Sequence, residues 1–191
     1  KYGIHASGVV YEEECATAAS YALIDENGER HFLSEKSIFE KLSGEDISDE
    51  AIEETDMIYI GSAMAMRKMD EGGIKDVFLR AHRLGKMTVM DAAYNLEDPE
   101  RDWLSYLAPA FMETDVFFPS MDEAVKITGQ TDPELIAECF KKFPMKAFGV
   151  KMGAKGCFVT DFKEKRFIKC PEGLPVVDTT GAGDSFMAGL M

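Results

Sequence analysis

The sequence predicts an α/β fold in which helices cover both faces of a mostly parallel sheet. Strand-like and helix-like segments alternate at least three times between residues 56 and 151, a pattern typical of βαβ units with right-handed crossovers. The chain has 191 residues, of which 46% are hydrophobic and 29% charged, as in ordinary globular proteins. This length indicates one domain, with a short N-terminal ribbon as the candidate for a separate subdomain.

The predicted ribbon lies at the start of the chain. Residues 16–24 are small and β-forming, and a return strand follows the Asn27-Gly28 dipeptide. Asn-Gly favours a tight hairpin because it tolerates positive φ. We therefore assign residues 1–34 to the ribbon and residues 35–191 to the α/β core.

The core is predicted as alternating strands and helices, recognised by apolar runs and by apolar residues at helical spacing. The predicted strands cover residues 56–63, 86–93, 116–119, 147–151, 156–161 and 166–170. The predicted helices cover residues 48–54, 74–84, 101–108, 120–127, 133–143 and 185–190. The third of these helices is expected to stop before Pro109.

Capping residues mark the ends of these helices. Ser48, Ser120 and Asp132 are N-cap candidates, because their side chains can accept from the first free backbone N–H groups. Gly85 and Gly129 end two of the helices, as glycine does at left-handed C-terminal positions. In open parallel sheets, ligands bind at the carboxyl ends of strands, and one strand delivers Asp91 there.

Charge and cysteine usage restrict the partners and the compartment. The formal net charge is −14, which would repel a polyanion, so we expect neither nucleic acid nor an anionic membrane as a partner. The sequence has no apolar run long enough for a transmembrane helix and no signal-peptide core. The four cysteines form no C-x-x-C pair and are typical of reduced thiols, so we expect a cytoplasmic protein.

The strongest chemical signal is DTTGAGDSF at residues 178–186. Gly181, Ala182 and Gly183 leave backbone amides unshielded where a helix begins, and such amides bind anions. A carboxylate at Asp184 would repel phosphate, so its place is explained if it accepts a proton from a hydroxyl that attacks phosphorus. The alternative is a Gly-rich turn with an acidic N-cap.

Four segments resemble the ribokinase-like, or PfkB, carbohydrate kinase family. DTTGAGDSF is similar to the family's C-terminal signature, and the other segments agree in order and spacing. FFPSMDEAVKITG (117–129) resembles a strand–Asn-x-x-Glu–helix segment, and GVKMGAKGCFV (149–159) resembles one that contacts nucleotide phosphates. ATAASYALIDENGERHF (16–32) resembles the lid ribbon that covers the sugar. The resemblance implies a ribokinase-like three-layer α/β/α fold.

The resemblance also implies an activity, namely transfer of a phosphoryl group from ATP to a hydroxyl with Mg²⁺. Fructose, ribose and 2-keto-3-deoxygluconate are candidate acceptors. Asp184 would be the catalytic base, and Gly181, Ala182 and Gly183 would form the anion hole. Glu123 would orient a magnesium-bound water.

Further residues are assigned by position within these segments. Lys151, Gly153 and Thr180 are implied near the ATP phosphates, although Lys151 is alternatively an ordinary surface lysine. Asp91 is a candidate for substrate contact or, alternatively, for a helix-capping or turn role. Ala18 and Ser20 of the ribbon are candidates for contact with the sugar.

Ser120 departs from the family pattern, which has Asn at this position. Serine keeps a hydroxyl donor and acceptor but is shorter, and here it fits equally well as a helix N-cap. The extent of the sequence also departs from the family pattern, because such kinases have an N-terminal sugar-binding portion and a C-terminal adenine pocket. We therefore expect this sequence to be a fragment or the ordered part of a longer chain.

Other functions stay open. One is a non-catalytic relative or inactive fragment that binds a ligand, and another is a nucleoside kinase. A dinucleotide-binding oxidoreductase is disfavoured, because no G-x-G-x-x-G follows an early strand. The open edges of the ribbon predict a homodimer formed through it.

Overall fold

The central sheet has six strands in the order β3-β4-β5-β6-β7-β8. Strands β3 to β6 are parallel, and β7 and β8 add in antiparallel orientation. A separate antiparallel pair, β1-β2, forms the ribbon. This is a computed structural model, and it describes residues 3, 6, 8–26, 30–35, 37–94, 98–173, 176 and 178–191.

The elements follow the predicted alternation. The strands are β1 (Ala19–Ile24), β2 (Arg30–Glu35), β3 (Met57–Ala63), β4 (Met87–Ala92), β5 (Val116–Phe117), β6 (Ala147–Lys151), β7 (Cys157–Thr160) and β8 (Lys165–Ile168). The helices are α1 (Asp49–Glu53), α2 (Ile74–Arg83), α3 (Trp103–Tyr106), α4 (Ala108–Phe111), α5 (Met121–Thr128), α6 (Pro133–Phe140) and α7 (Ala182–Leu190). Short 3₁₀ turns cover Ser37–Glu40, Gly44–Asp46 and Gly153–Lys155, and a π-helical turn covers Met69–Gly73.

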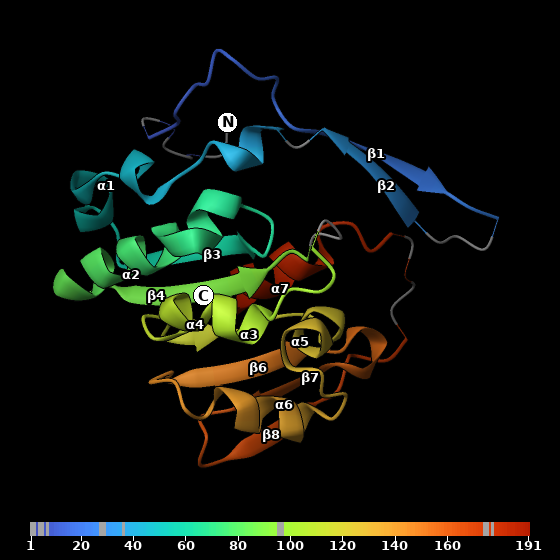
Figure 1. The fold of residues 1–191 in the computed structure, drawn as a ribbon. Helices are drawn as coiled ribbons and strands as arrows, with labels where there is room; N and C mark the ends of the chain where they lie inside the picture. Colours follow the sequence, from blue (N-terminus) through green and yellow to red (C-terminus); the bar gives the residue numbers. More distant parts are fainter. Residues whose placement is uncertain are drawn as a thin grey trace.

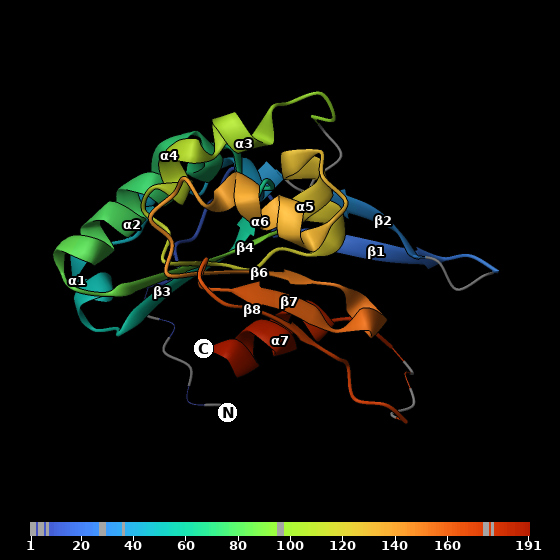
Figure 2. The ribbon, with the colours of Figure 1, turned by 90° about the horizontal axis from the view of Figure 1, so that it is seen from below.

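Helices lie on both faces of the sheet, so the predicted three-layer α/β/α fold is confirmed. Figure 2 shows α2 to α6 above the sheet and α7 below it. The larger core lies on the side of α2 to α6, and its phenylalanine rings pack with centroids 4.6 to 6.2 Å apart. Among the helices in the described ranges, none is long and apolar enough to cross a bilayer.

The opposite face carries a small core beneath α7. Val89, Phe118, Cys157 and Met187 are buried there, because alternate residues of each strand point to alternate faces. The Phe118 ring also lies against Phe186 of α7, with centroids 5.0 Å apart. These contacts pack α7 against the sheet.

Gly149 in β6 leaves the space that the Phe118 ring fills. A Cβ at residue 149 would lie only 2.1 Å from the Phe118 Cζ atom. We expect Gly149→Ala to lower the free energy of unfolding by about 3 kcal/mol, because a fully buried ring has to move. Denaturant unfolding measures the change.

Gly189→Ala is the matched control for that substitution. No atom lies within 4 Å of a Cβ built at Gly189, which lies in α7. Alanine there should be neutral or stabilising by up to about 1 kcal/mol. Equal unfolding midpoints for Gly149→Ala and the parent protein would show that Phe118 does not need this space.

The ribbon extends away from the sheet (Figure 1). Its register pairs Ala19 with Glu35 and Tyr21 with Leu33, and the Tyr21 and Leu33 side chains are exposed. The predicted Asn27-Gly28 turn lies outside the described residues. β2 runs to Glu35, one residue past the predicted end of the ribbon, and the division into ribbon and core stays a prediction.

Several boundaries differ from the prediction. The single helix expected over residues 101–108 is two short helices, α3 and α4, and Pro109 lies in the first turn of α4. Proline fits there because the first helical N–H groups need no partner within the helix. β5 has only two residues, α6 ends at Phe140, and α7 begins at Ala182, three residues before its predicted start.

Candidate active site at the carboxyl edge of the sheet

The N-terminus of α7 forms one side of the candidate site. Gly181 adopts a left-handed conformation with φ 75° and precedes the first helical residue, which glycine does without strain. Before it, Asp178 Oδ1 accepts from both the backbone N–H and the hydroxyl of Thr180, each at 2.8 Å. Asp184 lies in the exposed first turn. The predicted base and glycine turn are therefore adjacent at a helix start.

The three predicted anion-hole residues are not equivalent. The backbone N–H of Ala182 donates to the Thr179 carbonyl oxygen at 3.1 Å and so belongs to the turn. Gly183 faces Lys151, since a Cβ at residue 183 would lie 3.8 Å from Lys151 Nζ. The lysine ammonium therefore reaches the first turn of α7, where a cation and the helix N-terminus both favour an anion.

Lys151 is held from the other side by Asp91. Lys151 is the last residue of β6 and Asp91 is the last but one of β4, and an ion pair joins Lys151 Nζ to Asp91 Oδ2. The side chains are 15% and 6% exposed, and the other carboxylate oxygen of Asp91 accepts from the Ala92 N–H at 2.8 Å. Burial raises the pKa of Asp91, and Lys151 opposes that rise. The surface-lysine alternative is wrong for this side chain, because it is mostly buried.

Ser120 and Glu123 form a capping box at the start of α5. The Ser120 hydroxyl accepts from the Glu123 N–H at 3.4 Å, and Glu123 Oε2 accepts from the Ser120 N–H at 2.7 Å. The N-cap interpretation of Ser120 is confirmed. Glu123 Oε1 also accepts from the Tyr94 N–H at 3.4 Å, which ties α5 to the segment after β4. The magnesium role of Glu123 stays a prediction.

Tyr59 is a polar group of this region that sequence reasoning missed. Its hydroxyl oxygen would lie 2.6 Å from a Cβ at Gly61, so the phenol folds toward the carboxyl end of β3. Burial raises the pKa of Tyr59 to about 12, and the nearby charges of Asp91, Asp184 and Glu123 add to the rise. The alternation of residues along β3 predicts on which face of the sheet Tyr59 lies. It does not predict that the charges of Asp91, Asp184 and Glu123 lie near the Tyr59 hydroxyl.

The remaining predicted residues lie in turns or in the ribbon. Gly153 has a left-handed φ of 57° just after β6. Ala18 is partly buried before β1, and the Ser20 hydroxyl pairs with the Ser34 hydroxyl at 2.7 Å. Contact of either ribbon residue with a sugar stays a prediction.

The donor groups fit the cofactors that the sequence implies. Lys151 and the α7 start suit the phosphates of a nucleotide. The carboxylates are oxygen donors, which Mg²⁺ prefers, and this ion is usually held by one or two carboxylates together with phosphate and water. Within the described residues, no three His, Cys, Asp or Glu side chains form a metal cluster.

Comparison with known proteins identifies the family of the chain. The family described as "pfkB family carbohydrate kinase" matches residues 1–191. An uncharacterized sugar kinase of Archaeoglobus fulgidus is 22% identical over 182 residues, covering 95% of this chain and 70% of that protein. An ATP-dependent ribose-1-phosphate kinase of Halopiger xanaduensis is 27% identical over 195 residues, covering 99% of this chain and 58% of that protein.

Solved structures show the same fold. A fructokinase with bound ATP from Xylella fastidiosa superposes with a TM-score of 0.79 at 17% identity, covering 98% of this chain and 59% of that one. The chain thus spans between 58% and 70% of the length of these proteins. Because the family match covers all 191 residues, the chain belongs to the pfkB family of carbohydrate kinases.

Proposed function

We propose that this chain carries the phosphoryl-transfer centre of an ATP-dependent kinase that acts on a hydroxyl of a sugar or sugar acid. The observation that carries the proposal is that Asp184 lies in the exposed first turn of α7 and that the Lys151 ammonium reaches the same turn. A proton acceptor and an anion site next to each other are what phosphoryl transfer to an alcohol needs.

Each group has one role in the proposed reaction. The acceptor oxygen forms a bond to the γ-phosphorus, and the bond from that phosphorus to the β–γ bridging oxygen breaks. The hydroxyl proton passes to Asp184. Lys151 and the backbone amides of Gly181 and Gly183 would stabilise the charge on the transferring group, and Gly153 and Thr180 would contact the phosphates of ATP. Glu123 would hold Mg²⁺ through water, and the ion would supply positive charge to offset that of the ATP phosphates.

Two alternatives are tested by the same assay. Serine at residue 120 and the engaged carboxylate of Glu123 favour a non-catalytic relative. A nucleoside kinase would use the same centre with another acceptor. The assay measures ADP formation by the full-length protein with ATP, Mg²⁺ and a panel of sugars, sugar acids, sugar phosphates and nucleosides. Sugar-dependent ADP supports the proposal, and no turnover on any acceptor supports the non-catalytic alternative.

We also propose a cytoplasmic location and a homodimer formed through the ribbon. All four cysteines are free thiols, as is usual in a reducing compartment. Tyr21, Leu23 and Leu33 are 67%, 60% and 66% exposed on a ribbon with two open edges, a surface that a partner would cover. Light scattering should give twice the monomer mass, and Leu23→Lys/Leu33→Lys should halve it. A monomeric parent protein at working concentration would contradict the dimer.

A further inference from the structure

Tyr59 lies at the candidate site but has no role in the reaction described above. Its phenol lies across Gly61, because a Cβ at residue 61 would lie 2.6 Å from the Tyr59 hydroxyl oxygen and 2.9 Å from the ring carbon that bears it. The ring is half-buried and packs against the small core beneath α7. Glycine at residue 61 therefore lets the hydroxyl extend toward the carboxyl end of β3, on the face that α7 covers.

A β-bulge places this hydroxyl beside Asp91. The pairing of β3 with β4 is regular through Ile60 and then shifts by one residue. Gly61 and Ser62 of β3 therefore both lie opposite Asp91 of β4. Bulges re-aim side chains and are frequent next to active sites. After burial, the charge of Asp91 contributes most to the raised pKa of Tyr59, as this register leads us to expect.

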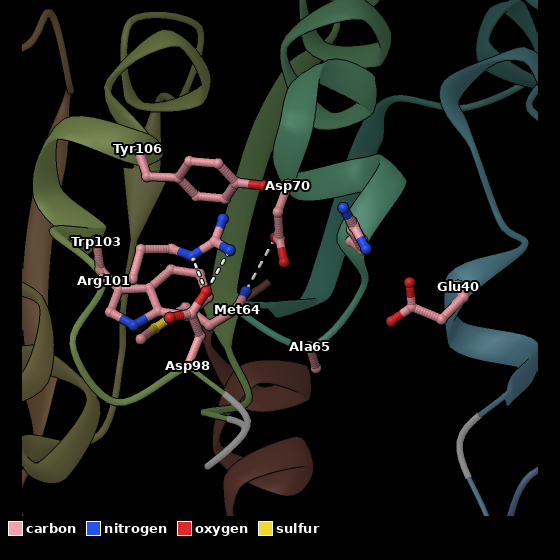
Figure 3. A pocket seen from close by; sticks show the side chains of 9 residues that line it. Glu40, Met64, Ala65, Asp70, Asp98, Arg101, Trp103 and Tyr106 are labelled. Carbon is pink, nitrogen blue, oxygen red and sulfur yellow. Dashed lines mark hydrogen bonds and ion pairs between the residues drawn. The ribbon is translucent and has the colours of Figure 1, made fainter.

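The end of β3 is held in place beyond the bulge. Met64 follows the strand with a left-handed φ of 73°, which is uncommon for a residue other than glycine. The buried Asp70 carboxylate accepts from the Met64 N–H at 3.0 Å, as the dashed line in Figure 3 marks. The strand end across which the Tyr59 ring lies is therefore fixed by a buried hydrogen bond.

Asp91 can accept a further hydrogen bond. Its side chain is 6% exposed and accepts from the Lys151 ammonium and from the Ala92 N–H. An ionised carboxylate has about four acceptor positions, and a phenol hydroxyl is a donor. Among the described residues, the Tyr59 hydroxyl has no hydrogen-bond partner. An uncommitted donor therefore lies beside a buried carboxylate that has acceptor positions left.

The proposed function explains why Asp91 would need that donor. When Lys151 binds the phosphates of ATP, its ammonium shares its hydrogen bonds between them and Asp91. A buried carboxylate that loses part of its cation is destabilised, and this loss opposes ATP binding. A hydroxyl that donates to the same carboxylate reduces the loss.

We propose that Tyr59 is a positioning residue for ATP binding, and that its hydroxyl donates to Asp91 when Lys151 binds the nucleotide phosphates. Tyr59 acts through Asp91 and Lys151, and it touches neither the phosphates nor the acceptor hydroxyl. The inference rests on the proposed function and adds a residue that supports its phosphate site.

Tyr59→Phe in the full-length protein removes the hydroxyl and keeps the ring. We expect the Kd of ATP, measured by calorimetry, and the KM for ATP to rise about 10-fold, as for one hydrogen bond to a charged group. The kcat should stay within about threefold, because Tyr59 touches no reacting atom. The unfolding midpoint in denaturant should not change, whereas a merely structural role would lower it. An unchanged Kd of ATP would overturn the inference.

Two further variants test the position of the hydroxyl. Gly61→Ala displaces the phenol without removing its hydroxyl, so it should weaken ATP binding as Tyr59→Phe does. Tyr106→Phe is the matched control, because Tyr106 is also half-buried but packs against the larger core on the opposite face, with its ring against Arg101 (Figure 3). It should leave the Kd of ATP unchanged, and an equal rise there would overturn the inference.

Asp91→Asn decides whether Tyr59 acts through Asp91. In that background, Tyr59→Phe should change the Kd of ATP by less than about twofold, because two residues that act as a unit are not additive. A full 10-fold effect would overturn the inference, since the hydroxyl would then act on another group.

The same measurements separate this inference from the kinase function. Sugar-dependent ADP formation with an unchanged Kd of ATP in Tyr59→Phe would overturn the role of Tyr59 and leave the kinase function standing. Tyr59-dependent ATP binding without ADP formation on any acceptor would overturn the kinase function and leave the role of Tyr59 in binding. A parent protein that does not bind ATP would overturn both.

Discussion

Asp184→Asn should lower kcat by about 10²- to 10⁴-fold, the usual contribution of a general base. The amide keeps the size of the carboxylate but cannot accept the hydroxyl proton. The fold should not change, because Asp184 is exposed in the first turn of α7 and its side chain has no ion-pair or hydrogen-bond partner among the described residues. Steady-state kinetics and circular dichroism measure the two effects, and the KM for the sugar should stay within a few fold.

Asp122→Asn is the matched control for this experiment. Asp122 is also an exposed acid in the first turn of a helix, α5. If the effect came only from the loss of a favourable charge at a helix N-terminus, both variants would lose about 0.3–1 kcal/mol of stability and neither would lose turnover. Equal turnover of Asp184→Asn and the parent protein would contradict the proposed base.

Lys151→Met should reduce both activity and stability. The loss of a charged hydrogen-bond donor from the phosphate site should lower kcat/KM for ATP by about 10- to 100-fold. The change also leaves the carboxylate of Asp91 buried without its cation, which costs about 3 kcal/mol. Lys151→Arg keeps the charge and should retain more activity and more stability than Lys151→Met does. An unchanged KM and kcat for ATP in Lys151→Met would contradict the phosphate role.

The double variant Lys151→Met/Asp91→Asn separates the two losses. It has no uncompensated buried charge, so we expect stability to recover while activity stays low.

The pH dependence of stability gives a second check on the Asp91–Lys151 pair. Without Lys151 the pKa of Asp91 rises further, so the folded protein holds the proton more tightly than the unfolded chain does. The loss of unfolding free energy in Lys151→Met relative to the parent protein should therefore be smallest at low pH and grow as the pH rises above about 4.

Much of the core could be predicted because burial imposes a period on the sequence. The continuous apolar runs at β3, β4 and β6 agree with the structure to within one or two residues, as do the caps at Ser48 and Ser120. β5 was predicted too long, since an apolar run does not reveal where strand pairing stops. The break between α3 and α4 was missed because proline is allowed both after a helix and in its first turn.

The site was predictable only in part. The DTTGAGDSF motif is local in sequence, and the structure shows its turn and helix start together. The Asp91–Lys151 pair joins residues 60 positions apart, and only the order of the strands brings them together. The left-handed conformation of Met64 and the folded-over ring of Tyr59 depend on tertiary packing. No pattern of residue types along the chain encodes such contacts.

Phe118 has a consequence for the chemistry as well as for stability. Its ring lies between Gly149 of β6 and Phe186 of α7. Phe186 is two residues from Asp184, and Gly149 is two residues from Lys151. The thickness of a single aromatic ring therefore acts as a spacer between Asp184, the proposed proton acceptor, and Lys151, the cation proposed to hold the phosphate. Under the proposed function, the separation of these two groups is set by a side chain packed between the sheet and α7.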